Sequence, residues 1–368
     1  MSYLIQATLS NPSHPEYGQV TVPFPVPDDQ YDQTMEQLAS LGIGDVLVQD
    51  CQVDELDSYY TVLNRLKDTA VNVDALDYLA KRLESFDEYE ASQFQGMAAK
   101  LDLTDMTDLV NLTFSCQEAT VITSFADLEQ VGRNHCMSLH GGAMPAEEYR
   151  TLDGKAEALK LLQSGQGTIT PYGIVYDNGM ELKPLYNGRQ FPGYLYKDCL
   201  LAFEITPKQG AEAVQNPEYL YLPASKRQIE RTMLRAGIEC VDDIQLCTRF
   251  DSLPEQVDNV LTVQYENISV LNEMCRTIAA LDDAQRTKLE AVILLTKPEN
   301  SSEIRQLAEN LEQFDFLPGS QSTAEYQQIN ALGYVAYHGA MTLEELMRED
   351  PAEQYQREQG LQMGQTMM

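Results

Sequence analysis

The sequence predicts an α+β fold made of two tandem related units, each combining short β-sheets with a small helical bundle. Three observations support this prediction. Short segments of alternating apolar residues end at prolines and glycines, other segments have the apolar period of a helix, and the helical pattern returns after about 195 residues. We expect an elongated molecule in which a β-meander joins the two units.

The first unit begins with strands. Residues 3–27 alternate like two strands around a polar turn, and residues 46–53 also read as a strand. Between them, residues 29–41 have a helical apolar face, and Gly42 is placed to end that helix.

Helices follow in the rest of the first unit. The apolar stripe in residues 73–98 breaks near Asp87, which predicts two short helices, and residues 105–114 read as a third. We expect the stripe to form the core of this unit. Its residues are Leu76, Leu79, Leu83, Phe86 and Phe94.

The second half repeats this order. Gly237 stands 195 residues after Gly42, and near the end of each unit HGGAMPAEEY (140–149) resembles YHGAMTLEEL (337–346). A constant offset through several elements indicates duplication of a domain. The counterpart of the apolar stripe is Leu271, Met274, Ile278, Leu281 and Leu289.

These signals divide the chain into four parts. We expect the first unit at residues 1–136 and the second at residues 196–340. Residues 137–195 are expected to be a connecting segment, in which Asn-Gly turn signals mark the β-meander. Residues 341–368 are expected to be a C-terminal helix or a frayed tail.

The charge of the chain is its most unusual property. It has 57 Asp and Glu against 25 Lys and Arg, a net charge of −32, and the excess is shared by residues 1–195 (29 acids, 11 bases) and 196–368 (28 acids, 14 bases). Such a chain is repelled by DNA, RNA and anionic membranes, so its expected partners are proteins with basic surfaces. The alternative is that the acidity only keeps the protein in solution.

The sequence shows no recognisable active site. It has no phosphate-binding loop, dinucleotide-binding glycine motif, HExxH or GxSxG. His135, Cys136 and His140 lie close together, but no further ligand has metal-site spacing, so we interpret the histidines as structural. We therefore expect no enzyme activity, no metal and no cofactor.

The expected compartment is the cytoplasm. No stretch approaches 18 consecutive apolar residues, the N-terminus does not resemble a signal peptide, and seven scattered cysteines lack a CxxC pair. This pattern is typical of reduced thiols in a cytosolic protein.

A family resemblance gives the acidity a possible role. The order ATLSNPSHPEYG, VPFP, DDQYDQTMEQLASLGI, ALDYLAKRLESFDEYEASQFQGMA, DLVNLTF and FADLEQVGR resembles the ArdA antirestriction proteins of conjugative plasmids and transposons. The resemblance covers residues 3–136 and, more loosely, residues 196–340. It implies a curved, acidic α+β protein that mimics bent B-form DNA and competitively occupies the DNA-binding groove of type I restriction–modification enzymes, or of a related host-defence complex.

The magnitude of the charge is compatible with such mimicry, since 32 charges correspond to about 16 base pairs of duplex. The resemblance points to acids of the helical region as the partner-binding array, on exposed faces of the helices and their connections. These acids are Asp74, Asp77, Glu84, Asp87, Glu88, Glu90, Asp102, Asp105 and Asp108.

Two alternatives accompany this prediction. The chain could be an acidic interaction or regulatory accessory protein of a mobile element that does not mimic DNA. Both a monomer with two pseudo-twofold-related units and a homodimer are compatible with the sequence.

Overall fold

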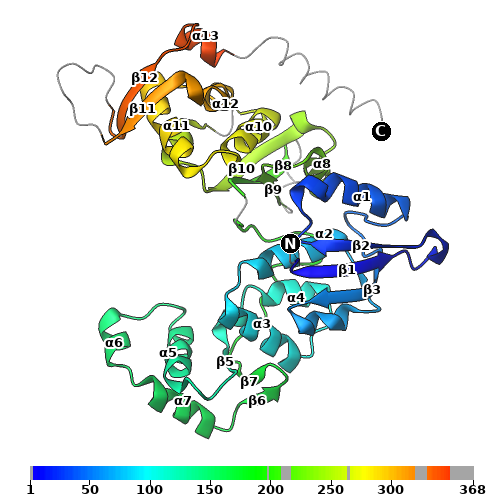
Figure 1. Ribbon diagram of the computed structural model, residues 1–368. Coiled ribbons are helices and arrows are strands. Elements are labelled where there is room, and N and C mark those ends of the chain that lie inside the picture. Colours follow the sequence, from blue (N-terminus) through cyan, green and yellow to red (C-terminus); the bar gives the residue numbers. More distant parts are fainter. Residues whose placement is uncertain (1–2, 197–198, 209–216, 263–265, 320–329, 349–368) are drawn as a thin grey trace. The chain divides into compact units, whose positions relative to one another are not determined.

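The computed structural model describes residues 3–196, 199–208, 217–262, 266–319 and 330–348. The chain divides into two compact units, Met1–Pro192 and Gly193–Met368 (Figure 1). Helices make up 46% and strands 18%, and every strand pair in the described ranges is antiparallel. The predicted α+β class is therefore confirmed.

The first unit contains two small sheets and seven α-helices in the described residues. Its strands are β1 (Ile5–Ser10), β2 (Gln19–Phe24), β3 (Cys51–Ser58), β4 (Ala70–Val71), β5 (Thr120–Ile122), β6 (Thr168–Thr170) and β7 (Gly173–Tyr176). Its helices are α1 (Tyr31–Ser40), α2 (Val73–Glu84), α3 (Glu88–Lys100), α4 (Met106–Leu112), α5 (Leu128–Leu139), α6 (Ala146–Thr151) and α7 (Gly154–Gln163), with short 3₁₀ turns at Pro15–Tyr17, Asp28–Gln30, Thr61–Leu66 and Cys116–Glu118.

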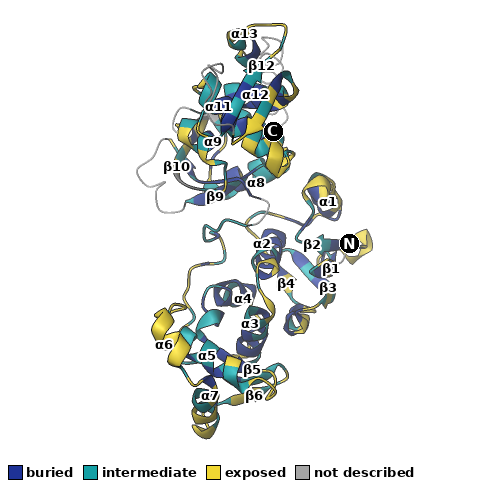
Figure 2. Ribbon diagram, turned by 60° about the vertical axis from the view of Figure 1, so that its left-hand side comes forward, coloured by how far each residue is buried: buried dark blue, intermediate teal, exposed yellow. Residues whose placement is uncertain are grey.

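One core joins the sheets and helices of this unit. The first sheet has the order β2-β1-β3-β4, and its apolar face packs with α2, α3 and α4 in a single cluster. Leu76, Leu79, Leu83 and Phe94 are buried, and Phe86 is partly buried against them. Figure 2 shows α3 and α4 largely buried and α6 largely exposed. The predicted apolar stripe therefore faces the core.

The first unit extends well beyond residue 136. Strand β7 pairs with β5 in the sheet β5-β7-β6, and Val175 of β7 is fully buried in the core of the unit. Further along the chain, Phe191 stacks on Tyr78, and Asn111 exchanges two hydrogen bonds with the backbone of Tyr186 (2.9 and 2.7 Å). Residues 137–192 are thus part of the first unit, and the prediction of a connecting segment there is wrong, because long-range pairing decides the boundary.

Helices α5 and α7 approach each other closely. A Cβ atom on Gly132 of α5 would overlap the carbonyl oxygen of Gly154, the first residue of α7, so only glycine fits at this contact. The three helices α5 to α7, with β6, occupy the chain between β5 and β7.

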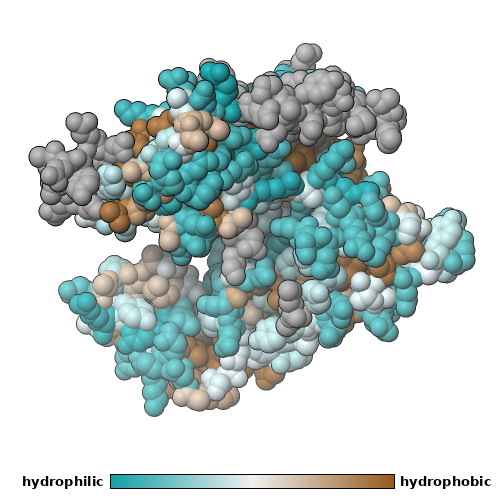
Figure 3. Space-filling view, turned by 45° about the horizontal axis from the view of Figure 1, so that its top comes forward, coloured by the Kyte–Doolittle hydropathy of each residue, from teal (hydrophilic) through white to brown (hydrophobic). Residues whose placement is uncertain are grey.

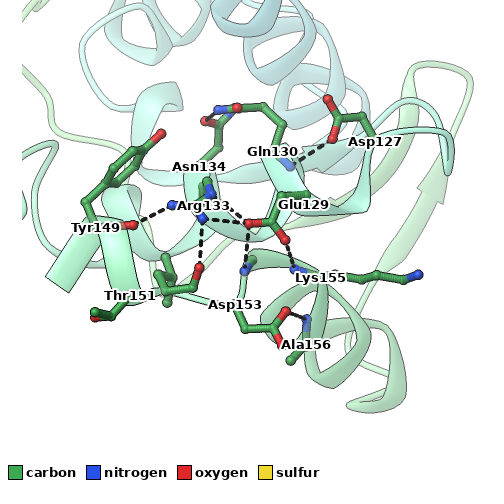
Figure 4. Close-up of polar contacts among 12 residues, drawn as sticks. Asp127, Glu129, Gln130, Arg133, Asn134, Tyr149, Thr151, Asp153, Lys155 and Ala156 are labelled. Atoms are coloured by element: carbon green, nitrogen blue, oxygen red, sulfur yellow. Dashed lines mark hydrogen bonds and ion pairs between the residues drawn. The ribbon is translucent and has the colours of Figure 1, made fainter.

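Arg133 fastens these helices together (Figure 4). Its guanidinium donates hydrogen bonds to Glu129 on the preceding turn (2.7 Å), to the carbonyl oxygen of Tyr149 and to that of Leu152 (2.8 Å). The Glu129 carboxylate in turn accepts from the backbone N–H of Lys155 (2.9 Å) at the start of α7. That bond is the largest of the causes that lower the pKa of Glu129.

The second unit has its own core and three groups of elements. Its strands are β8 (Leu201–Pro207), β9 (Glu218–Leu222), β10 (Ile244–Asp251), β11 (Phe314–Pro318) and β12 (Gly333–Tyr337). Its helices are α8 (Lys226–Ala236), α9 (Glu255–Val260), α10 (Ile268–Ala279), α11 (Asp283–Thr296), α12 (Ser301–Glu309) and α13 (Leu343–Met347), with 3₁₀ turns at Val241–Asp243 and Leu311–Gln313.

The two units have the same order of elements. Helices α1, α2, α3 and α4 begin 195 residues before α8, α10, α11 and α12, respectively. In both units the first strand is the middle one of its sheet, flanked by the second and third strands. Such agreement in order and pairing is what a duplicated domain produces.

Equivalent residues also end the first helix of each unit. Gly42 and Gly237 have φ angles of 69° and 72°, in the left-handed region that favours glycine. The next backbone N–H closes the turn in each case, from Ile43 to Leu38 (3.1 Å) and from Ile238 to Met233 (2.9 Å).

One predicted similarity does not mark equivalent positions. Residues 337–346 lie at and after the end of β12, whereas residues 140–149 follow α5. The counterpart of β12 is β7, because Val335 pairs with Phe316 as Val175 pairs with Val121. Helices α5 to α7 separate the paired strands in the first unit, whereas 320–329 of the second unit and the tail 349–368 lie outside the described residues.

Truncating equivalent core residues tests the shared packing. Leu83 and Ile278, 195 residues apart, are both fully buried, so Leu83→Ala and Ile278→Ala should each lower the free energy of unfolding of their unit by about 2–5 kcal/mol. Leu101→Ala, at a half-exposed position, is the control and should cost at most about 1 kcal/mol. Urea denaturation measures all three, and equal small losses would show that the helices do not pack as described.

His135 should make the attachment of α5 dependent on pH. Its Nδ1 lies 3.0 Å from the Thr120 hydroxyl on β5, which already accepts a hydrogen bond from Asn178 (2.9 Å) and so has its own hydrogen for a neutral imidazole. Burial lowers the pKa of His135, while Glu157 partly opposes this. The stability contributed by neutral His135 is therefore present above about pH 6.5 and lost as the pH falls through the lowered pKa.

The expected result is a difference in unfolding free energy between the wild type and His135→Gln that narrows from pH 7.5 to pH 5. Comparing two variants at each pH removes the effect of the many other carboxylates. A difference that stays constant over this range would contradict the role of the neutral imidazole.

Candidate partner-binding surface

Two of the nine predicted array acids are buried. Asp74 and Asp77 on α2 are 8% and 7% exposed, so the expectation that they lie on an exposed face is wrong. Asp77 accepts a hydrogen bond from the backbone N–H of Val26 (2.7 Å), just after β2, and Asp74 accepts one from the Tyr31 hydroxyl (3.4 Å). Both carboxylates lie where α2 meets the segment that follows β2.

Asp77 also has a buried cationic partner. Lys81, one turn later on α2, lies 3.0 Å from its carboxylate. Burial alone would lower the pKa of Lys81, but the charge and hydrogen bond of Asp77 outweigh it and raise that pKa. In the second unit Asn272 takes the same place and accepts from the N–H of Ala224 (2.7 Å). An amide in the equivalent position indicates a structural role for Asp77.

Three array acids begin helices. Asp87 accepts from the N–H groups of Tyr89 and Glu90 (both 2.8 Å), and Glu90 returns a bond to the backbone of Asp87, which forms a capping box at α3. Asp105 accepts from the N–H of Thr107 (2.8 Å) at α4. These carboxylates are exposed or half-exposed and keep their charge beside a helix N-terminus, which favours the ionised form.

Asp102 is exposed but has a neighbouring cation. It adopts a left-handed backbone conformation (φ 54°) between α3 and α4, and Arg65 lies 3.1 Å from its carboxylate. The Asp102 side chain is 88% exposed, so the pair is well screened and contributes little stability.

Glu84, Glu88 and Asp108 fit the predicted surface best. Glu84 and Glu88 are exposed and Asp108 is half-exposed, and in the part of the chain that the structure describes their carboxylates take part in no hydrogen bond or ion pair. Seven of the nine acids are thus at least partly exposed, and three of these seven carry charge that no local partner offsets.

The first sheet adds acids that the sequence prediction left out of the array. Strand β3 carries Asp54, Glu55 and Asp57, and the register of β3 on β1 shifts at Asp54, where Thr8 pairs with Glu55 and Leu9 with Val53. This bulge leaves Val53 and Leu56 facing the core and turns the acids away from it. The pairing, and not the residue pattern alone, places all three on the outside.

The charge of this region is unopposed over a long stretch. Residues 1–64 contain ten Asp and Glu and no Lys or Arg, a pattern that could have been counted from the sequence. Figure 3 shows hydrophilic side chains over most of the face that it presents.

The cations of the first unit are few and largely occupied. Of its eleven Lys and Arg, at least six form ion pairs within the unit, and Arg82 lies over the ring of Phe114 (4.3 Å). The pairs are Arg65–Asp102, Lys81–Asp77, Lys100–Asp177, Arg133–Glu129, Lys160–Glu157 and Lys183–Glu118. Each pair cancels a charge locally, so the remaining carboxylates set the sign of the surface.

The residues considered for catalysis have structural surroundings. Burial raises the pKa of the Cys136 thiol, and His140 contacts the carbonyl oxygen of the same residue (2.7 Å). Among the described residues no group of three or more His, Cys, Asp or Glu is arranged to hold a metal ion. No helix found in those ranges combines the length and the apolar character needed to cross a bilayer.

Comparison with known protein families, curated proteins and solved structures gives no match to this chain.

Removing the buried carboxylate tests its structural role. Asp77→Ala leaves the N–H of Val26 and the ammonium of Lys81 without their partner, so it should cost about 3–5 kcal/mol of unfolding free energy. Asp77→Asn keeps an acceptor for Val26, as Asn272 does for Ala224, and should cost less. Thermal or urea unfolding distinguishes the two, and a negligible loss in Asp77→Ala would return this acid to the surface.

Proposed function

We propose that this protein is an acidic DNA mimic that competitively occupies the DNA-binding groove of a type I restriction–modification enzyme, or of a related host-defence DNA-binding complex. It would act in the cytoplasm as an inhibitor without a chemical step of its own. The resemblance of residues 3–136 to the ArdA antirestriction proteins supports this choice of partner.

One observation carries the proposal: the first unit exposes carboxylates without the cations that would offset them. Residues 1–64 have no Lys or Arg, and Glu55, Asp57, Glu84 and Glu88 are exposed without an ion pair among the described residues. A groove that binds DNA presents Lys and Arg to phosphates, and the same side chains can pair with carboxylates. The groove would gain these pairs by losing DNA, which makes the inhibition competitive.

A second candidate function is an interaction protein that does not mimic DNA. The observation that favours it is the exposure of apolar side chains around the helices α5 to α7, where Phe125 is 62% and Ile169 is 85% exposed. Such side chains could dock on an apolar surface. Salt separates the two functions, since ion pairs weaken with ionic strength and apolar contacts do not.

A graded series of neutral variants tests the mimic. Because each exposed ion pair contributes only about 0.2–1 kcal/mol, one Glu→Gln or Asp→Asn change should barely weaken inhibition, and losses should accumulate with the number of changes. The series uses Glu55, Asp57, Glu84, Glu88, Asp102 and Asp108, changed singly, in threes and together.

Inhibition of a type I restriction enzyme, and binding to its methyltransferase core, are measured at about 50 and 200 mM salt, a range over which phosphate-type contacts weaken strongly. The apolar control is Phe125→Ser with Ile169→Ser, which should leave binding intact. Loss of activity at a single carboxylate, or binding that ignores salt and fails in the apolar control, would reject the mimic in favour of another mode of action.

A further inference from the structure

We propose that the two units have diverged in charge, so that the first unit carries the groove-binding surface and the second does not. This inference rests on the proposed function and specifies which part of the chain performs it. It comes from comparing equivalent positions in the two units, each considered by itself.

The units differ in their cations rather than in their acids. Residues 1–114 contain 20 Asp and Glu and 5 Lys and Arg, whereas the equivalent residues 196–309 contain 19 acids and 12 bases. Net charges of −15 and −7 follow from nearly the same number of carboxylates. A basic groove responds to the summed field of a surface, so interspersed cations weaken its attraction.

The first helices of the units show the contrast most clearly. Helix α1 contains Asp32 and Glu36 and no Lys or Arg. Helix α8, which begins 195 residues later, contains four bases and only Glu230 as an acid. The same element has therefore changed from net negative to net positive while keeping its length and its closing glycine.

The helical acids differ in the same direction. Only three of the nine positions of the predicted array are acidic in the second unit, as Asp282, Asp283 and Glu303. At the loop position of Asp102 (φ 54°) the second unit has Lys297 in the same left-handed conformation (φ 52°). One backbone geometry thus holds opposite charges in the two units.

Local structure is preserved where the charge is lost. Glu90 and Gln285 both complete a capping box, and Asp105 and Asn300 both cap the next helix. Neutral side chains therefore suffice for the fold at these positions. The carboxylates of the first unit exceed what capping requires, and binding a cationic partner is a use for that excess.

A charge-swap variant tests the inference without changing the net charge of −32. It exchanges the residues at three exposed or half-exposed pairs of equivalent positions, each of which already accepts the other residue in the same local structure. The changes are Glu84→Ala with Ala279→Glu, Glu90→Gln with Gln285→Glu, and Asp105→Asn with Asn300→Asp.

The probe is the methyltransferase core of a type I restriction–modification enzyme. Losing three charges from the first unit should weaken binding by about 3- to 150-fold, and placing them on the second should not restore it. The matched control removes three exposed acids from the second unit, by Asp283→Asn, Glu299→Gln and Glu312→Gln, and should leave the dissociation constant within about twofold. Circular dichroism and melting temperature show whether each variant is folded.

The outcomes separate this inference from the proposed function. If the wild type does not bind the core, the proposed function fails for that partner. If the wild type binds and the swapped protein binds equally well, or if the control loses as much as the swap, both units contribute and the inference is overturned. Weakening in the swap alone supports it.

Discussion

A folded chain with 32 excess negative charges has to keep each carboxylate in water or give it a donor, because a buried carboxylate without a partner costs several kcal/mol. The first unit satisfies this constraint in three ways. Asp77 is buried with Lys81 and the N–H of Val26, and Asp87 lies at a helix start, where backbone N–H groups bind it. Glu55 on β3 points away from the core. The sheet order, the helix starts and the outer surface all reflect where carboxylates can be tolerated.

The local parts of this arrangement could be predicted from the sequence. The break of the apolar stripe at Asp87 marks the capping box that begins α3, and Gly42 ends α1, because both signals depend on neighbouring residues alone. The offset of 195 residues returns in the starts of α10, α11 and α12. Helices of this kind carry their boundaries in a short stretch of chain.

Features that depend on distant residues could not be predicted in this way. Asp77 has the periodicity of a polar helix position, but its donor at Val26 is 51 residues away, on a segment that the pattern does not place beside α2. The boundary at residue 192 depends on the pairing of β7 with β5, across three helices. Exposure of the acids on β3 depends on a bulge defined by the register with β1. In each case a partner supplied by the tertiary fold decides the outcome.

Duplication supplies an internal comparison that separates structural residues from dispensable charge. Where the second unit has an amide, as at Asn272 and Asn300, the hydrogen bond of the first unit is kept and the charge is not needed. By this criterion Asp77 is a structural residue, whereas the charge of Asp105 is additional to its capping role. The excess of negative charge in the first unit is therefore a property of the surface and not a requirement of the fold.

The central claim is that carboxylates of this protein take the place of DNA phosphates in a groove, and competition at equilibrium tests it most directly. A labelled DNA duplex of about 16 base pairs, matched to the charge of the chain, is titrated with the methyltransferase core at several fixed concentrations of the protein. The account predicts that the apparent dissociation constant for DNA rises in proportion to the concentration of the protein, without a ternary complex. A ternary complex of DNA, enzyme and protein, or a DNA affinity that the protein leaves unchanged, would contradict it.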